Sequence, residues 1–142
     1  MYRYEELAEA ADKRIVQEKR FTNAGIKGIK LFLSNIVNLL NIPSDFVNDR
    51  ELGHINRLII KEDSIRVDSN GVHCVLICSF GNTKVSQEIT CLPLEEEMFS
   101  FCMKDSTASA SLSELENNNA TEAVEMFSHV MFKRFTSGVF RD

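Results

Sequence analysis

The fold is decided by the stretch from Ile65 to Met103, IRVDSNGVHCVLICSFGNTKVSQEITCLPLEEEMFSFCM. Two turn signals, Asn70-Gly71 and Gly81-Asn82, divide it into runs of strand length. Gly and Asn tolerate the positive φ angles that tight hairpin turns require. The stretch therefore predicts an antiparallel meander of four to five strands, with the rest of the chain forming helices that pack on one side of it.

Placing the two turns at hairpin tips pairs Asp68 with His73 and Cys78 with Val85. Because side chains alternate along a strand, each face of the sheet can then be listed. The face expected to be apolar collects Ile65, Val67, Val72, Cys74, Leu76, Cys78, Phe80, Val85, Ile89 and Cys91. The opposite face collects Arg66, Asp68, His73, Val75, Ile77, Ser79, Lys84, Ser86, Glu88 and Thr90. Gln87 is the exception on the apolar face and needs a hydrogen-bond partner if it is buried.

The remaining segments predict a single α+β domain over residues 1–142, with a helical part at 1–43 and the antiparallel sheet at 55–103. The helical part is expected as two helices, 2–19 and 22–41, the second capped by Thr22 or Asn23 and ended by Pro43. Residues 44–52 are a short helical candidate. The run 55–61 suits a strand or a helix, and we favour a strand. Pro93 is expected at a loop or an edge.

The segments after the sheet are a polar loop at 104–118, mobile or with a helical turn at 112–116, and a closing helix at 119–138. Asn119 and Glu122 have the spacing of a capping box, and Gly138 suits a helix stop. The fourth strand, 98–103, is apolar on both sides, which is typical of a strand covered on both faces or at a subunit contact.

Composition narrows the class of protein. The net charge is -5, which argues against a general binder of nucleic-acid backbones, so contacts through Lys27, Lys30 and Lys133-Arg134 are a weak hypothesis. The chain has no window of 18 uncharged apolar residues, so we expect no membrane span. Its charged N-terminus lacks the apolar region of a secretory signal. We therefore expect a cytoplasmic protein whose four cysteines are reduced packing thiols.

No catalytic or metal-binding motif is present. His54, His73 and His129 do not combine with Cys or carboxylates at metal-ligand spacing. The expected pairing of His73 with Asp68 suits either an acid–base couple or a plain cross-strand contact. We therefore predict no catalytic residues, no metal and no cofactor.

Two surfaces are candidate binding sites. The first is the polar sheet face, which has an apolar centre and a polar rim: Arg66, Asp68, His73, Val75, Ile77, Lys84, Ser86 and Glu88. The second is the acidic run Glu95-Glu96-Glu97, which suits a basic partner or plain solvation beside an edge strand.

The main functional hypothesis is a non-enzymatic protein-interaction module, an inhibitor, adaptor or chaperone acting as a homo-oligomer with a protein partner. The alternative is a binder of small anionic ligands, or a small enzyme, with a pocket between sheet and helices and His73, Arg66 and Lys84 at its mouth.

Overall fold

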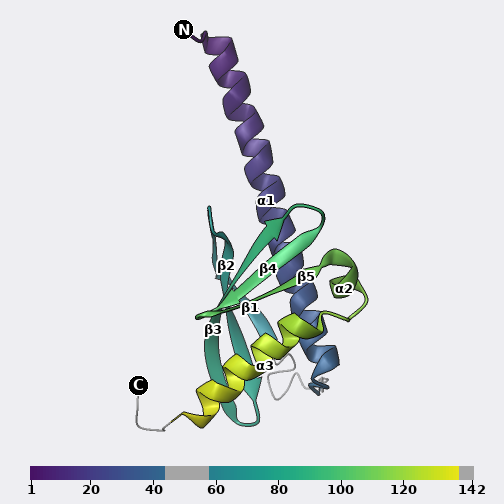
Figure 1. The fold of residues 1–142 in the computed structure, drawn as a ribbon. Coiled ribbons are helices and arrows are strands. Elements are labelled where there is room, and N and C mark those ends of the chain that lie inside the picture. The colour runs from purple at the N-terminus through teal and green to yellow at the C-terminus, as the bar shows by residue number, and fades with distance from the viewer. Residues whose placement is uncertain (44–57, 138–142) are drawn as a thin grey trace.

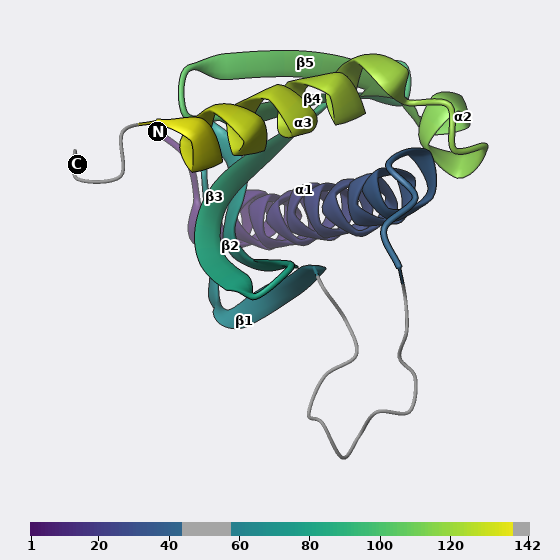
Figure 2. The ribbon, with the colours of Figure 1, turned by 90° about the horizontal axis from the view of Figure 1, so that it is seen from below.

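The computed structural model describes residues 1–43 and 58–137. It is an α+β fold, as predicted, in which a five-stranded antiparallel sheet with the strand order β1-β2-β3-β4-β5 curves around helices on one side (Figures 1 and 2). The elements are α1 (Tyr4–Leu39), β1 (Leu58–Asp68), β2 (Gly71–Phe80), β3 (Thr83–Leu94), β4 (Met98–Met103), β5 (Ser106–Ser111), α2 (Leu112–Glu116) and α3 (Thr121–Thr136).

The two predicted N-terminal helices are one continuous helix, α1. The expected cap at Thr22 is wrong because its hydroxyl donates to the Glu18 carbonyl inside the helix, at 2.8 Å. No proline or glycine at 20–22 interrupts the backbone ladder, so the helix runs through. It ends at Leu39, ahead of Pro43: Asn41 takes a positive φ of 54° and the Ile42 N–H bonds to the Val37 carbonyl, as in a Schellman motif.

Some predictions fall on residues that the structure does not describe. The helical candidate at 44–52, His54, residues 55–57 and the stop at Gly138 all lie outside the described ranges. The described part of the ambiguous run, Leu58–Lys61, belongs to β1 and is therefore a strand, as we favoured.

The first hairpin has a different register from the predicted one. Its turn is Ser69-Asn70, and Asp68 pairs with Gly71 rather than with His73. The Asp68 carboxylate accepts the Asn70 N–H at 2.8 Å, which starts the turn one residue early, and Gly71 then takes the positive φ of 128°. A slip of two residues keeps each side chain on its face, so the face assignment near the turn survives.

Further along this hairpin, β1 bulges between Lys61 and Arg66. The Ser64 hydroxyl in the bulge accepts the Val75 N–H that would otherwise lack a strand partner, at 2.8 Å. On the other side of the bulge, Leu58 pairs with Cys78 and lies on the core face. Val67, which we expected on the buried apolar face, is 41% exposed.

The second hairpin has the predicted register. Val72 pairs with Cys91 and Cys78 with Val85. The predicted apolar face forms the core: six of its residues are buried, namely Val72, Cys74, Leu76, Cys78, Ile89 and Cys91, and Ile65, Phe80 and Val85 are partly buried against them.

The third hairpin turns through Glu95, Glu96 and Glu97, since Leu94 pairs with Met98. Pro93 lies in β3 beyond Cys91, the last residue that pairs with β2, and thus at a local edge. In β4 one side is buried and the other is partly exposed, so the described chain does not cover this strand on both faces.

The expected polar loop at 104–118 is wrong in its first half. Lys104-Asp105 is a two-residue turn, with Lys104 at a positive φ of 55°, and Ser106–Ser111 pairs with β4 as β5. The alternating small residues bury Ala108 and Ala110. The second half contains the helical turn that we expected, α2.

The closing helix α3 begins at Thr121, and its N-cap is Ala120 without a side-chain bond, so the predicted Asn119 cap is wrong. Its junction with α2 is instead fixed by Asn35, which is fully buried on α1. The Asn35 amide donates to the Leu115 carbonyl at 2.8 Å and accepts the Ala120 N–H at 3.1 Å. Three segments of the core are thereby tied together.

Two glycines bring α1 close to the sheet. A Cβ atom on Gly25 would lie 2.2 Å from Val72 Cγ2, and one on Gly28 would lie 2.8 Å from Cys91 Sγ. Real Cβ atoms do not approach so closely, because protein interiors are already close-packed. The helix therefore rests directly on β2 and β3 at these residues.

Candidate binding surfaces

The helices α1 and α3 both pack on the concave side of the sheet, where they share one core (Figure 2). No described helix or strand covers the opposite side, which we call the open face. The part of this face that concerns us lies on β1, β2 and β3, and directly paired residues of these strands point to the same side. All eight residues predicted for the first binding surface belong to these strands.

A hydrogen-bonded chain crosses the open face at His73, although only 7% of this residue is exposed. The His73 Nδ1 atom lies 2.7 Å from the Thr90 hydroxyl, and Nε2 lies 2.8 Å from an Asp68 carboxylate oxygen. Arg66 completes the row, with guanidinium nitrogens 3.4 Å from Asp68 and 3.9 Å from Glu88. The structure thus brings His73 and Asp68 together as expected, but as diagonal neighbours of the hairpin.

The Asp68 carboxyl is held in its charged form. The hydrogen bond with His73, the Asn70 N–H and the nearby Arg66 charge lower its pKa below the ordinary value of 3.8. A carboxylate with a lowered pKa is a weaker base, which does not suit a proton-abstracting role at neutral pH.

The row Thr90–His73–Asp68 has the composition of a hydroxyl–imidazole–carboxylate triad, which sequence reasoning missed because Thr90 lies on another strand. The residues around this row indicate a structural contact rather than a catalytic triad. Thr90 pairs with His73 on one side and with Cys102 on the other, so its backbone is engaged in the sheet ladder. A triad needs backbone donors aimed at a reacting oxygen. A sheet face whose backbone is already paired does not offer them.

The apolar centre of the open face is larger than the sequence indicated. Ile59 of β1 pairs with Ile77 and is 42% exposed. With Val75 and Ile77, which are half-buried, it forms a three-residue aliphatic cluster that we call the Ile59 cluster. Ile59 follows the buried Leu58, so the alternation in the run from Leu58 to Lys61 would have found it had the strand been certain.

The other predicted surface residues lie at the edges of this cluster. Ser86 pairs with Ile77 and Glu88 with Val75, which places both beside the aliphatic side chains. Lys84 lies at the beginning of β3 and is exposed. The acidic run Glu95-Glu96-Glu97 forms the exposed β3–β4 turn, in which Glu96 and Glu97 take positive φ angles of 58° and 57°.

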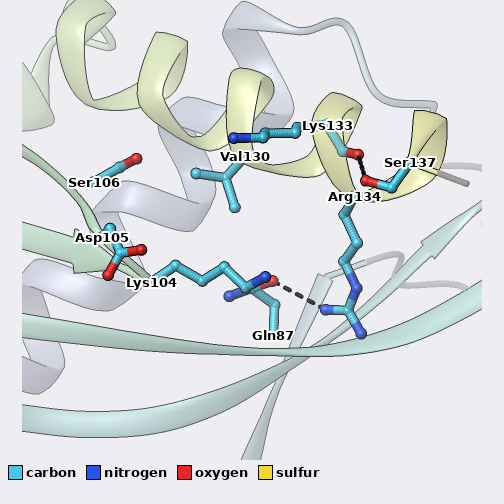
Figure 3. A pocket seen from close by; sticks show the side chains of 8 residues that line it. All are labelled: Gln87, Lys104, Asp105, Ser106, Val130, Lys133, Arg134 and Ser137. Carbon is cyan, nitrogen blue, oxygen red and sulfur yellow. Dashed lines mark hydrogen bonds between the residues drawn. The ribbon is translucent and has the colours of Figure 1, made fainter. Parts of the chain in front are cut away.

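A separate small cavity of about 200 Å³ lies between the sheet and α3 (Figure 3). It is lined by Gln87, Lys104, Asp105, Ser106, Val130, Lys133, Arg134 and Ser137. Arg134 reaches from α3 to the Gln87 side chain at 2.9 Å and to the Ser86 carbonyl at 2.6 Å, which provides the partner that buried Gln87 requires. His73, Arg66 and Lys84, which we expected at the mouth of such a pocket, are instead on the open face.

The four cysteines are free thiols, and three of them are buried. Burial raises the pKa of Cys74 and Cys78 to about 11 and that of Cys91 to about 12. Such thiols remain protonated at neutral pH and are poor nucleophiles. They fill the core between sheet and α1, as the sequence predicted.

The described residues contain no cluster of three or more His, Cys, Asp or Glu side chains able to hold a metal ion. Among the helices in the described ranges, none has the length and apolar character to cross a membrane. Comparisons with protein families, with curated proteins and with solved structures find no match to this chain.

Proposed function

We propose that this protein is a non-enzymatic protein-interaction module, an inhibitor, adaptor or chaperone, that acts as a homo-oligomer and binds its partner through the open face. The observation that carries the proposal is the Ile59 cluster, in which Ile59 of the edge strand β1 is 42% exposed and Val75 and Ile77 of β2 are half-buried, on a sheet face that no described element covers. Apolar side chains inside a polar rim are typical of interface centres.

The rim supports the same proposal. Arg66, Asp68 and His73 already pair with one another, so a partner that covers them does not leave isolated charges buried. Pairing within one chain also holds these side chains in place before binding, which lowers the entropic cost of association.

A cluster variant and a control variant on the same hairpin test the proposal. Ile59→Thr, combined with Ile77→Thr, removes the aliphatic cluster while keeping the β-branched shape that strands favour. Val67→Thr makes the same kind of change at an exposed β1 residue outside the cluster. In pull-downs from the native host followed by mass spectrometry, a partner captured by wild type and Val67→Thr should be lost with the cluster variant. Capture of the same proteins by all three would contradict a role for the open face.

The alternative proposal is a site for a small anionic ligand in the cavity beside α3. Its supporting observation is the group of cationic side chains that line it, Lys104, Lys133 and Arg134, with Asp105 as the opposing charge. A thermal-shift screen with inorganic phosphate and nucleotides tests this. Stabilisation that disappears in Lys104→Ala/Lys133→Ala would favour the ligand site, and a flat screen would remove it.

A further inference from the structure

The strand β5 is one edge of the sheet, and its outer side meets no other strand of residues 1–43 and 58–137. Figure 2 shows β5 at the upper margin of the molecule, with α3 on its inner side, toward α1. A strand in this position presents unpaired backbone N–H and C=O groups, which are a template for pairing with another strand. This edge is therefore a candidate interaction surface, distinct from the open face.

Every second residue of β5 turns its backbone away from β4. Ser106 follows a two-residue turn, and the residues that close such a turn exchange both backbone hydrogen bonds. Further along the chain, the Leu112 N–H donates to the Glu97 carbonyl at 2.8 Å, which is the same step of the alternation. The even-numbered residues of β5 thus bond to β4, and the odd-numbered residues point their backbone groups outward.

The outward groups that remain unpaired belong to Thr107 and Ser109. Both residues are exposed, and no hydrogen bond from another described segment reaches the N–H or C=O group of either. The third outward residue is Ser111, whose N–H already donates to the Glu114 carboxylate at 2.9 Å in the cap of α2. The free part of this edge is therefore short, and its centre is Ala108.

The two edges of the sheet differ in how they are protected. The opposite edge, β1, has a bulge between Lys61 and Arg66, and this part of the strand also contains the charged residues Glu62 and Asp63. Charges and bulges are the devices by which proteins prevent edge strands from pairing. β5 consists only of Ser, Thr and Ala, and it pairs with β4 in continuous register. One edge is thus protected, and the other is open to a further strand.

From this edge we infer that β5 pairs with β5 of a second copy of this chain, in the antiparallel direction and with a two-fold axis at Ala108. The inference rests on the homo-oligomer part of the proposed function and names the surface that forms it. In this register Thr107 of one copy lies opposite Ser109 of the other, and such a pair exchanges two backbone hydrogen bonds. The two-fold axis repeats the pair, so each outward group of Thr107 and Ser109 gains a partner.

A second copy suits this edge better than an unrelated strand. The side chains are compatible, because Ala108 faces Ala108 on the concave side and the hydroxyls of Thr107 and Ser109 meet on the open face, a combination that cross-strand pairs favour. The joined sheet ends in β1 on both sides, where charges and bulge stop further growth, so the assembly is closed. A single extended peptide would instead leave a new unprotected edge.

The interface is small, since it consists of a few backbone hydrogen bonds and short side chains. We therefore expect a weak dimer with a Kd on the order of 100 µM. Sedimentation equilibrium of the full chain from about 10 µM to about 1 mM spans this value and measures the dimer directly.

A proline at Ser109 tests the backbone contact. Ser109→Pro removes the outward N–H, which is half of the donors of the interface, and the fold should tolerate the change because this N–H does not bond to β4. Ser109→Val is the matched control, because it changes the same side chain but keeps the N–H. Wild type and Ser109→Val should dimerise, whereas Ser109→Pro should raise the Kd at least tenfold. Circular dichroism should show that both variants are folded.

Charged side chains test the register without proline. Thr107→Lys/Ser109→Lys sets lysines opposite each other across the interface, and Thr107→Glu/Ser109→Glu does the same with carboxylates. Each variant should dimerise more weakly than wild type, because like charges directly opposite are destabilising. An equal mixture should form a heterodimer, since each lysine then faces a glutamate. Both residues are exposed, so the changes leave the core intact. Absence of the heterodimer would overturn this register.

Hydrogen exchange followed by NMR reads the same contact one residue at a time. The amides of Thr107 and Ser109 should exchange more slowly as the protein concentration passes the Kd. The amides of Ala108 and Ala110 should be protected at every concentration, because they bond to β4 within one chain. Exchange at Thr107 and Ser109 that does not change with concentration would overturn the inference.

The outcomes separate the inference from the proposed function. If Ser109→Pro dimerises as strongly as wild type, or if Ser109→Val weakens the dimer equally, the β5 edge is not the interface, while a homo-oligomer formed by another surface survives. A wild-type chain that stays monomeric over the whole concentration range would remove both the β5 pairing and the homo-oligomer, and the open face would still be tested by the pull-downs.

Discussion

The contact between α1 and the sheet at Gly25 provides the sharpest test of the packing described above. Gly25→Ala adds one methyl group at a residue that is buried against Val72. The new Cβ would lie 2.2 Å from Val72 Cγ2 and 2.7 Å from Val72 Cβ. Carbon atoms in contact prefer separations of about 3.5–4.0 Å, so α1 or β2 has to move by more than 1 Å to accept the methyl group.

Two effects oppose each other in this variant. Alanine is about 1 kcal/mol more favourable than glycine inside a helix. Overpacking a core with an extra methyl group typically costs about 1–3 kcal/mol, and the depth of this overlap places Gly25 at the upper end. The clash therefore wins, and we expect a net loss of about 2 kcal/mol, which lowers Tm by about 7 °C in a chain of this size.

Urea unfolding monitored by circular dichroism measures the loss. Asn23 provides a matched control, because it is exposed on the same turn of α1. The difference between Asn23→Ala and Asn23→Gly gives the helix-propensity part for this helix without any packing change. If Gly25→Ala is as stable as wild type, or more stable by the amount that the Asn23 pair gives, the close approach of α1 to β2 is refuted.

The remaining predictions concern other residues of the core and the open face. Asn35→Ala should cost about 2–4 kcal/mol in urea unfolding, because it leaves the buried Ala120 N–H without its acceptor, whereas a cost below about 0.5 kcal/mol would contradict that role. Asp68 has a folded pKa below its unfolded value of 3.8, so its charged form stabilises the fold above that pH and the contribution is lost as the pH falls through the folded pKa. The stability difference between wild type and Asp68→Asn should therefore shrink between about pH 7 and about pH 3, and an unchanged difference would rule out this linkage. Maleimide labelling of the native protein should modify the half-exposed Cys102 before buried Cys91, whose raised pKa keeps the thiol protonated; equal labelling would argue against the buried thiol.

The sheet was predictable wherever alternation and turn chemistry agreed. The second hairpin has the predicted register because Gly81, at a positive φ of 60°, suits the tight turn. The first hairpin differs from the predicted register because the Asp68 carboxylate accepts a hydrogen bond from the Asn70 N–H. This local bond competes with the turn that Asn-Gly favours. Residue preferences rank turn types, but they do not reveal which neighbouring side chain completes one.

β5 was missed for a different reason. STASAS has weak strand propensity and reads as a flexible polar segment. It becomes a strand because β4 offers it a free edge and α3 packs against it, which buries Ala108 and Ala110. Context of this kind is set by the tertiary structure. The buried Asn35 was invisible for the same reason, since its partners are about 80 residues away along the chain.

The break that we predicted between residues 19 and 22 has a bearing on function. Two separate helices would have placed the first one on the core, as a surface helix usually lies. A continuous α1 instead carries the stripe of Tyr4 and Ile15 beyond the sheet, where its own chain does not cover it. The exposed stripe and the glycines Gly25 and Gly28 that contact the sheet are thus parts of one continuous helix, which leaves the stripe available to a partner.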